Sequence, residues 1–405
     1  MKRLHYAAIA LACALTACGG GGNSGVSKTE ITTVKVAGAS LADSGAFGFK
    51  FTVQGPNPST PFSVYPERIA STYGAAALCP AYLGKATTPN AAPTTGCTNY
   101  AVAGASVNAY DLTAHAQLPT YPVSGVKQLA DMAAAGSFGN KDLVIVGELA
   151  ANDVATLVEA YSALATGGTD FQTMLLTLLD STTVSTYMGT AQGRAALGVL
   201  YMQKVADKLR DAINTHLLAH GAQRVAVLNT LDVTYTPRLQ ASLALLRSTE
   251  SLPSNHPSFH PPGSADAFQA MVRAWVQGFN TQLATDLAPY SSKVAIVDFY
   301  TNFSAEMADP AQYGLKNVTN TVCDEIVNAG TTTSVSTAGA TKLTTPSTVA
   351  ACNATAASAL TPHQDGGSST WWQGYLFADY FHPTPYGHQL LAQLVAKRLT
   401  EAGWL

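Results

Sequence analysis

The chain has 405 residues, of which only 12% are charged, and its formal net charge is −3. Such a sparse and balanced set of charges provides no basic surface of the kind that binds nucleic acid. The length is compatible with one α/β core that carries insertions.

Residues 1–17 have the pattern of a secretory signal, with a basic start at Lys2 and Arg3 and an apolar run that ends in Leu-Thr-Ala before Cys18. Small residues before a cysteine, followed by a glycine-rich stretch, resemble the lipidation signal of a bacterial lipoprotein. We therefore expect an outer-membrane lipoprotein attached through lipid on Cys18, with residues 18–33 as a flexible tether and residues 34–405 as the folded domain. Gly19, after the cysteine, resembles an outer-membrane sorting signal. The alternative is an ordinary signal peptide and a secreted protein.

Strand-like apolar runs alternate with helical patterns along the rest of the chain. This alternation predicts a mostly parallel sheet with helices on both faces. The expected strands are residues 34–37, 143–146, 225–228 and 294–297, and the expected helices are residues 126–135, residues 194–220 and an apolar stripe that follows Pro385.

Two polar motifs lie near opposite ends of this domain. Ser40 follows the first expected strand, and Asp379 and His382 stand three residues apart before Pro383. A serine hydroxyl needs a base within hydrogen-bond reach, and that base needs a third group to hold its tautomer. Asp379 and His382 can be those two groups, so the sequence predicts a hydrolytic triad with Ser40.

Two long segments interrupt the alternating pattern, residues 51–98 and residues 317–367, and each contains two cysteines. Such loops either wall a substrate pocket or decorate the surface. Outside the cytoplasm, four cysteines indicate two disulfides, for which three pairings exist. Local closure favours Cys79 with Cys97 and Cys323 with Cys352. A metal site is the rival interpretation, but no cysteine has a partner at C-x-x-C spacing.

Two further features are open to more than one interpretation. Trp371 and Trp372, upstream of Asp379, are either exposed aromatic residues that grip a substrate or part of the core. Asp153 is expected to cap a following helix.

Four segments, in chain order, resemble the conserved blocks of the GDSL esterase and lipase family, also called SGNH hydrolases. They are similar to that family's Gly-Asp-Ser-Leu, Asn-Tyr-Ala-x-Gly-Gly-Ala, Gly-x-Asn-Asp and Asp-x-x-His-Pro motifs, and they cover almost the whole domain. The segments are residues 38–45, 99–105, 146–153 and 379–383. The chain departs from the pattern at Ala39, where the family has aspartate, and at Ala151, where it has glycine.

The resemblance implies roles for individual residues. Ser40 would be the nucleophile, and Asp379 and His382 the rest of the triad. The oxyanion donors would be the backbone N–H groups of Ser40 and Gly104 and the side chain of Asn152. The implied fold is a three-layer α/β/α sandwich with a mostly parallel, flavodoxin-like sheet and loop insertions.

We therefore expect a serine esterase or lipase that hydrolyses carboxylic esters without a metal or cofactor. Its substrate would be a small-molecule, lipid or polyester ester, its contact with the membrane would be the lipid on Cys18, and it would act as a monomer. Two alternatives are an O-deacetylase of envelope or extracellular polysaccharide and a surface-binding lipoprotein that has lost catalysis, which the absent aspartate at residue 39 would permit.

Overall fold

The computed structural model of the chain describes residues 30–57, 61–328, 346–361, 363–365 and 367–405. Residues 1–29, with Cys18 and the expected signal and tether to residue 29, lie outside this part.

Four strands form an all-parallel sheet in the order β1-β4-β5-β6. Their side chains are buried almost throughout, as expected where helices cover both faces of a parallel sheet. The predicted α/β class is confirmed, and β5 and β6 coincide with the predicted ranges. The strands are β1 (Thr33–Ala37), β4 (Asp142–Val146), β5 (Val225–Leu228) and β6 (Val294–Val297).

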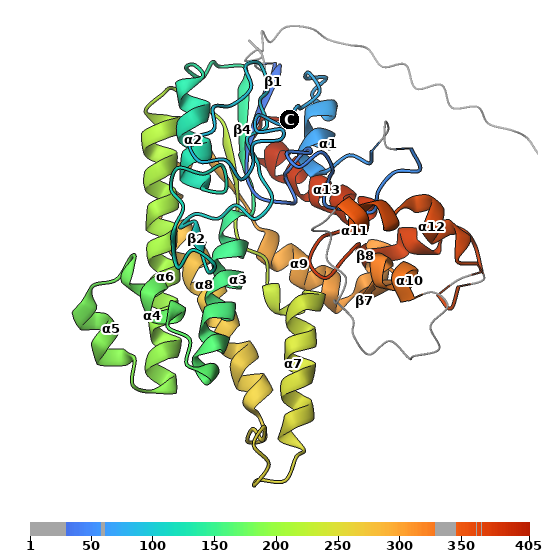
Figure 1. The fold of residues 1–405 in the computed structure, drawn as a ribbon. Coiled ribbons are helices and arrows are strands. Elements are labelled where there is room, and N and C mark those ends of the chain that lie inside the picture. The colour runs from blue at the N-terminus through green and yellow to red at the C-terminus, as the bar shows by residue number, and fades with distance from the viewer. Residues whose placement is uncertain (1–29, 58–60, 329–345, 362, 366) are drawn as a thin grey trace, which may run out of the picture.

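Helices lie on both sides of this sheet (Figure 1). On one side α1 packs against α13 and both touch strands, and on the other α2 contacts β1 while α6 runs along α8. Thr384 caps α13, because its side chain accepts the Gly387 N–H at 3.1 Å, and Pro385 occupies the first turn. These helices are α1 (Tyr65–Thr72), α2 (Gly125–Ala134), α6 (Ala191–Ala212), α8 (Ser264–Leu287) and α13 (Pro385–Glu401).

The helix expected at 194–220 is two pieces, because α6 ends at Ala212 and a π-helical turn continues from Ile213 to Leu218. Several helices have no counterpart in the sequence predictions. They are α3 (Leu149–Ala163), α4 (Asp170–Leu176), α5 (Ser181–Tyr187), α7 (Pro237–Glu250), α9 (Phe299–Ala308), α10 (Val322–Asn328), α11 (Pro346–Ala351) and α12 (Ala354–Ala359).

The connection at β1 determines where a site can form. The edge of β1 away from β4 pairs with residues 98–100, since the Val36 N–H donates to the Thr98 carbonyl at 2.9 Å and the Tyr100 N–H donates to the Val36 carbonyl at 2.7 Å. After β1 the chain therefore first runs along the outer edge of this strand, at residues 98–100, and only later returns as β4 along its other edge. In parallel α/β sheets, ligands bind at the carboxyl ends of strands at such a switch point. Ser40 lies three residues beyond the end of β1.

The segment from residue 317 supports the turn that carries Asp379. Strand β7 (Asn317–Thr321) pairs in parallel with β8 (Tyr375–Phe377), and the Cys323 N–H donates to the Ala378 carbonyl at 2.8 Å. A disulfide joins Cys323 to Cys352, and a second joins Cys79 to Cys97, which is the favoured pairing. Trp371 and Trp372 are 1% and 4% exposed, so they belong to the core of this segment.

Candidate active site

Asp379 and His382 form a direct pair in the turn between β8 and α13. The His382 Nδ1 lies 2.8 Å from each carboxylate oxygen of Asp379. Oδ1 of Asp379 also accepts the backbone N–H groups of Phe381, at 2.9 Å, and His382, at 2.6 Å. An ionised carboxylate accepts its hydrogen bond from Nδ1–H, which leaves Nε2 as the acceptor of the neutral imidazole. The pair therefore has the arrangement of a base held by its orienting acid.

Ser40 lies in the turn after β1 and is 4% exposed. Four contacts hold this turn from other elements or from within it: the N–H of Gly38 donates to Gln128, that of Leu41 to Glu148, that of Ala42 to Ala39, and the Ala42 carbonyl accepts from Asn99. A serine on a turn fixed in this way has little freedom of position.

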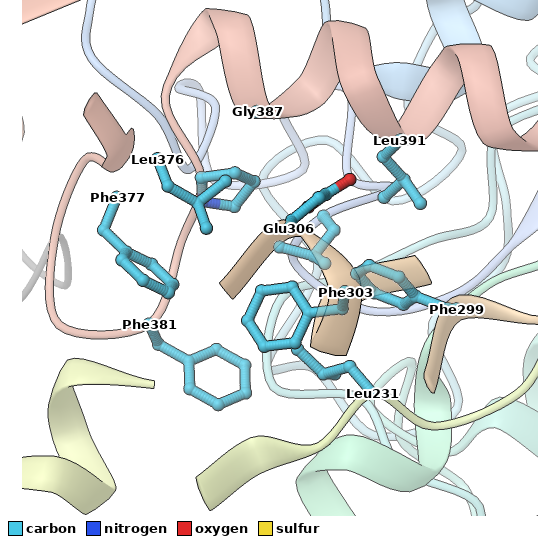
Figure 2. Close-up of a pocket in the computed structure, with 11 residues that line it drawn as sticks. Leu231, Phe299, Phe303, Glu306, Leu376, Phe377, Phe381, Gly387 and Leu391 are labelled. Carbon is cyan, nitrogen blue, oxygen red and sulfur yellow. The ribbon is translucent and has the colours of Figure 1, made fainter. Parts of the chain in front are cut away.

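Neighbours of Ser40 and of His382 line the same apolar pocket. They are Leu41, next to Ser40, and Phe381 and Pro383, on either side of His382. Figure 2 shows Phe381 among the side chains of this pocket. Within the described residues, Ser40 and His382 share no direct hydrogen bond. The hydrogen bonds of a catalytic site are often long in the free enzyme and shorten when substrate binds.

Gly104 is the third residue of a tight turn over residues 102–105. The Ala105 N–H donates to the Val102 carbonyl at 3.0 Å and closes the turn. Gly104 has a φ of +80°, and a Cβ added there would meet nothing within 4 Å. A positive φ at the third position of a turn favours glycine. The residue is exposed, so its backbone faces open space.

Asn152 and Asp153, in the first turn of α3, hold the segment that follows Gly104. The Asn152 Nδ2 donates to the Ala105 carbonyl at 2.8 Å, and its second N–H remains for another acceptor. The Asp153 carboxylate accepts the N–H groups of Val107 and Asn108 at 2.8 and 2.9 Å. The expectation that Asp153 caps a helix is therefore wrong: Asp153 lies inside α3 and binds the N–H groups of a distant loop.

Two backbone N–H groups at this site have no acceptor among the described residues, those of Ser40 and Gly104. Their neighbours do: the Leu41 N–H donates to Glu148, and the Ala103 N–H donates to Asp43 at 2.9 Å. Ser40 is buried, where backbone donors are normally paired, whereas Gly104 is exposed and its N–H is open to solvent. These are two of the three donors that the resemblance implies.

Asp43 is a supporting residue that sequence reasoning missed. Its carboxylate is buried and accepts three N–H groups, from Gly45, Ala46 and Ala103. It therefore ties the Ser40 turn to the Gly104 turn. Burial raises its pKa to about 6, against the opposing effect of these three hydrogen bonds. A charged residue three positions after the serine was the available signal.

His388 is fully buried on α13. Burial lowers its pKa to about 3, with a smaller effect from the positive charge of Arg68, so the imidazole is neutral at physiological pH.

Across the part of the chain that the structure describes, no group of three or more His, Cys, Asp or Glu side chains is placed to hold a metal ion. In the same residues no helix is both long and apolar enough to cross a bilayer. The two disulfides are consistent with an extracytoplasmic location.

Two comparisons with known proteins were made. No protein-family model matches the chain, and no curated protein is significantly similar to it in sequence.

Proposed function

We propose that the protein is a serine hydrolase of carboxylic esters, of the SGNH type, with Ser40 as its nucleophile. The observation that carries this proposal is the combination of an Asp379–His382 pair with two unpaired backbone donors, at Ser40 and Gly104, on turns at the carboxyl end of β1. An acyl-transfer site needs a base and an oxyanion site, and these groups can provide both.

In the proposed mechanism, the Ser40 Oγ attacks the ester carbonyl carbon while its proton passes to Nε2 of His382. The carbonyl oxygen becomes negative and is bound by the N–H groups of Ser40, Gly104 and Asn152. When the intermediate collapses, Nε2 returns the proton to the leaving alcohol and an acyl-enzyme remains. Water then attacks the acyl carbon and gives a proton to Nε2. When this second intermediate collapses, Nε2 returns the proton to the Ser40 Oγ, the carboxylic acid leaves, and the serine hydroxyl is regenerated. Asp379 stabilises the imidazolium throughout.

An aromatic strip supports a neutral, apolar substrate. Phe47 is 39% exposed, and its ring centroid lies 6.1 Å from that of Phe51, whose ring lies 4.9 Å from His382. Phe49 packs against both, with its centroid 6.3 Å from that of Phe47 and 5.1 Å from that of Phe51. Aromatic side chains offer large apolar contact areas, so this strip can hold an acyl or alkyl chain beside the base. The sparse surface charge agrees with such a substrate.

The cellular location of the enzyme is also part of the proposal. The lipidation motif at Cys18 and the two disulfides support an outer-membrane lipoprotein that acts outside the cytoplasm.

Hydrolysis of p-nitrophenyl esters from acetate to palmitate tests this function. The full chain in detergent should release p-nitrophenol, and Ser40→Ala should reduce kcat by at least about a thousandfold without lowering the melting temperature. Turnover of acetyl esters alone, with acetate released from acetylated polysaccharide, would favour the deacetylase. No turnover of any ester by the wild-type protein would favour a binding lipoprotein.

A further inference from the structure

The turn that carries Ser40 is held by a carboxylate from another strand. Glu148 lies two residues beyond the end of β4, and its side chain is 2% exposed. Its Oε1 accepts the backbone N–H of Leu41 at 2.8 Å, across 107 positions of sequence. Leu41 directly follows Ser40, so this hydrogen bond acts on the peptide unit next to the nucleophile.

The turn has no acceptor of its own for that N–H. Residue 39 is alanine, whose methyl group cannot accept a hydrogen bond. The N–H of Ala42 donates to the Ala39 carbonyl, and that of Gly38 donates to Gln128, so each of these two N–H groups has an acceptor of its own. Successive peptide units in a tight turn are fixed relative to one another. Glu148 therefore restricts the direction of the neighbouring Ser40 N–H, which has no acceptor among the described residues.

The pKa of the Glu148 carboxyl group is affected by burial and by nearby polar and charged groups. Burial raises its pKa to about 7, while the N–H groups of Glu148 itself and Leu41, then the charge of His382, then the N–H of Ala39, favour the ionised form. Tyr65 of α1 faces the same group: burial, and then the negative charge of Glu148, raise the pKa of its hydroxyl. The Glu148 Oε2 and the Tyr65 hydroxyl are both buried without a hydrogen-bond partner in the described part of the chain.

We propose that Glu148 is the positioning residue of the nucleophile turn: by accepting the Leu41 N–H it aims Ser40 and its backbone donor. This inference rests on the proposed function. The family pattern has a carboxylate at residue 39, where this chain has alanine. Here a carboxylate beyond the end of β4 would take that role, so Ala39 has a physical explanation other than loss of catalysis.

Two substitutions test this hydrogen bond. Glu148→Leu removes the acceptor, and we expect kcat to fall about a hundredfold with a much smaller change in KM, because a nucleophile displaced by about 1 Å loses that much. Glu148→Gln keeps an oxygen acceptor for Leu41, so kcat at pH 8 should fall by less than about tenfold.

Asp142→Asn is the matched control. Asp142 stands at the start of β4, where its carboxylate accepts the Gly139 N–H at 2.9 Å, at the opposite end of the strand from the site. It should leave kcat and KM unchanged. Wild-type kcat in Glu148→Leu would overturn the proposal. If that variant does not fold, a loss of kcat of about a hundredfold or more in folded Glu148→Gln would overturn it instead, because that variant keeps the acceptor for Leu41.

Amide hydrogen exchange at Leu41 tests the same proposal without any substrate. The Leu41 N–H should exchange at least about tenfold faster in Glu148→Leu than in Glu148→Gln or Asp142→Asn, because only the leucine removes the acceptor. Equal exchange in all three would contradict the positioning role. If the wild-type protein hydrolyses no ester, the proposed function fails, and the exchange result still decides whether Glu148 holds the turn.

Discussion

The carboxylate of Asp379 has two roles. It shapes its own turn by accepting the N–H groups of Phe381 and His382, and it orients the imidazole through Nδ1. The side chain is fully buried, so a charge there is stabilised by these donors rather than by water.

Asp379→Asn should preserve the turn and disable the base. The amide oxygen can still accept the backbone N–H groups, but the neutral amide no longer stabilises the imidazolium or selects the Nδ1–H tautomer. We expect kcat for a p-nitrophenyl ester to fall about 10³- to 10⁴-fold with little change in melting temperature. Activity close to that of the wild-type protein would show that His382 is not the base.

Asn152 is the side-chain donor of the proposed oxyanion site. Asn152→Ala should lower kcat/KM by about 10²- to 10³-fold, because one donor to the developing negative charge is lost. The Ala105 carbonyl also loses a partner, so the melting temperature should be measured in parallel. Ser44→Ala, which changes a side chain in the serine turn that makes no hydrogen bond in the described residues, should retain full activity.

At the scale of elements, the buried strands were predictable and the supports of the site were not. Strands β4, β5 and β6 have near-continuous apolar runs that are visible in the sequence, and β1 has apolar residues at Val34, Val36 and Ala37. The contacts of Glu148 with Leu41 and of Asp43 with Ala103 join residues that are far apart in sequence, and no local pattern encodes them. Helix α8 was missed although it is long.

The segment that contains Cys323 and Cys352 illustrates the same limit. Its composition of small polar residues indicated a loop, yet it forms β7 and helices that pack on the buried Trp371 and Trp372. Tertiary contacts and the disulfide, rather than local propensity, explain this order. The four motif segments can be picked out of the sequence because each is short and local, and the roles assigned to their residues stay predictions.

Replacing both Cys323 and Cys352 with serine should weaken the support of the Asp379 turn. We expect the unfolding free energy to fall by about 2–4 kcal/mol, since the unfolded chain regains the freedom of a closed loop of 29 residues. Amide exchange in residues 375–378 should rise, because Cys323 donates to Ala378. The pair Cys79→Ser and Cys97→Ser is the comparison, and it should leave exchange at 375–378 unchanged. Equal exchange in both double variants would contradict this support.

The aromatic strip of Phe47, Phe49 and Phe51 should affect substrate choice rather than chemistry. Phe47→Ser should raise KM for long-chain esters by about tenfold, in keeping with about 1–2 kcal/mol of lost apolar contact, and leave acetate turnover unchanged. Leu245→Ser is the matched control, since Leu245 is 68% exposed on α7. An equal loss with acetate and palmitate esters would show that Phe47 does not contact the chain of the substrate.

For the whole molecule, three buried carboxyl groups make stability depend on pH. Burial raises the pKa of Glu148, Asp153 and Glu306 to about 7 in each case. Between pH 6.5 and 8 the folded state holds protons there that the unfolded state has already released, so stability falls as pH rises. His388, whose folded pKa is lowered to about 3, has little effect in this range because it is largely neutral in both states.

Denaturant unfolding at pH 6.5 and pH 8 measures this effect. We expect the unfolding free energy to be lower at pH 8, by roughly 0.5–1 kcal/mol for each of the three groups. In the wild-type protein the Glu306 side chain accepts a hydrogen bond from Asn302. Glu306→Gln should reduce the difference in unfolding free energy between the two pH values by the contribution of one group. A stability that rises between these two pH values would contradict the account of buried carboxyl groups.

The central claim is that Ser40 is the nucleophile, and covalent labelling with a fluorophosphonate followed by peptide mass spectrometry tests it most directly. We predict one adduct, on Ser40, that forms in Ser44→Ala and is lost in Ser40→Ala and greatly slowed in Asp379→Asn. An adduct on another serine, or no adduct on folded wild-type protein, would contradict the claim.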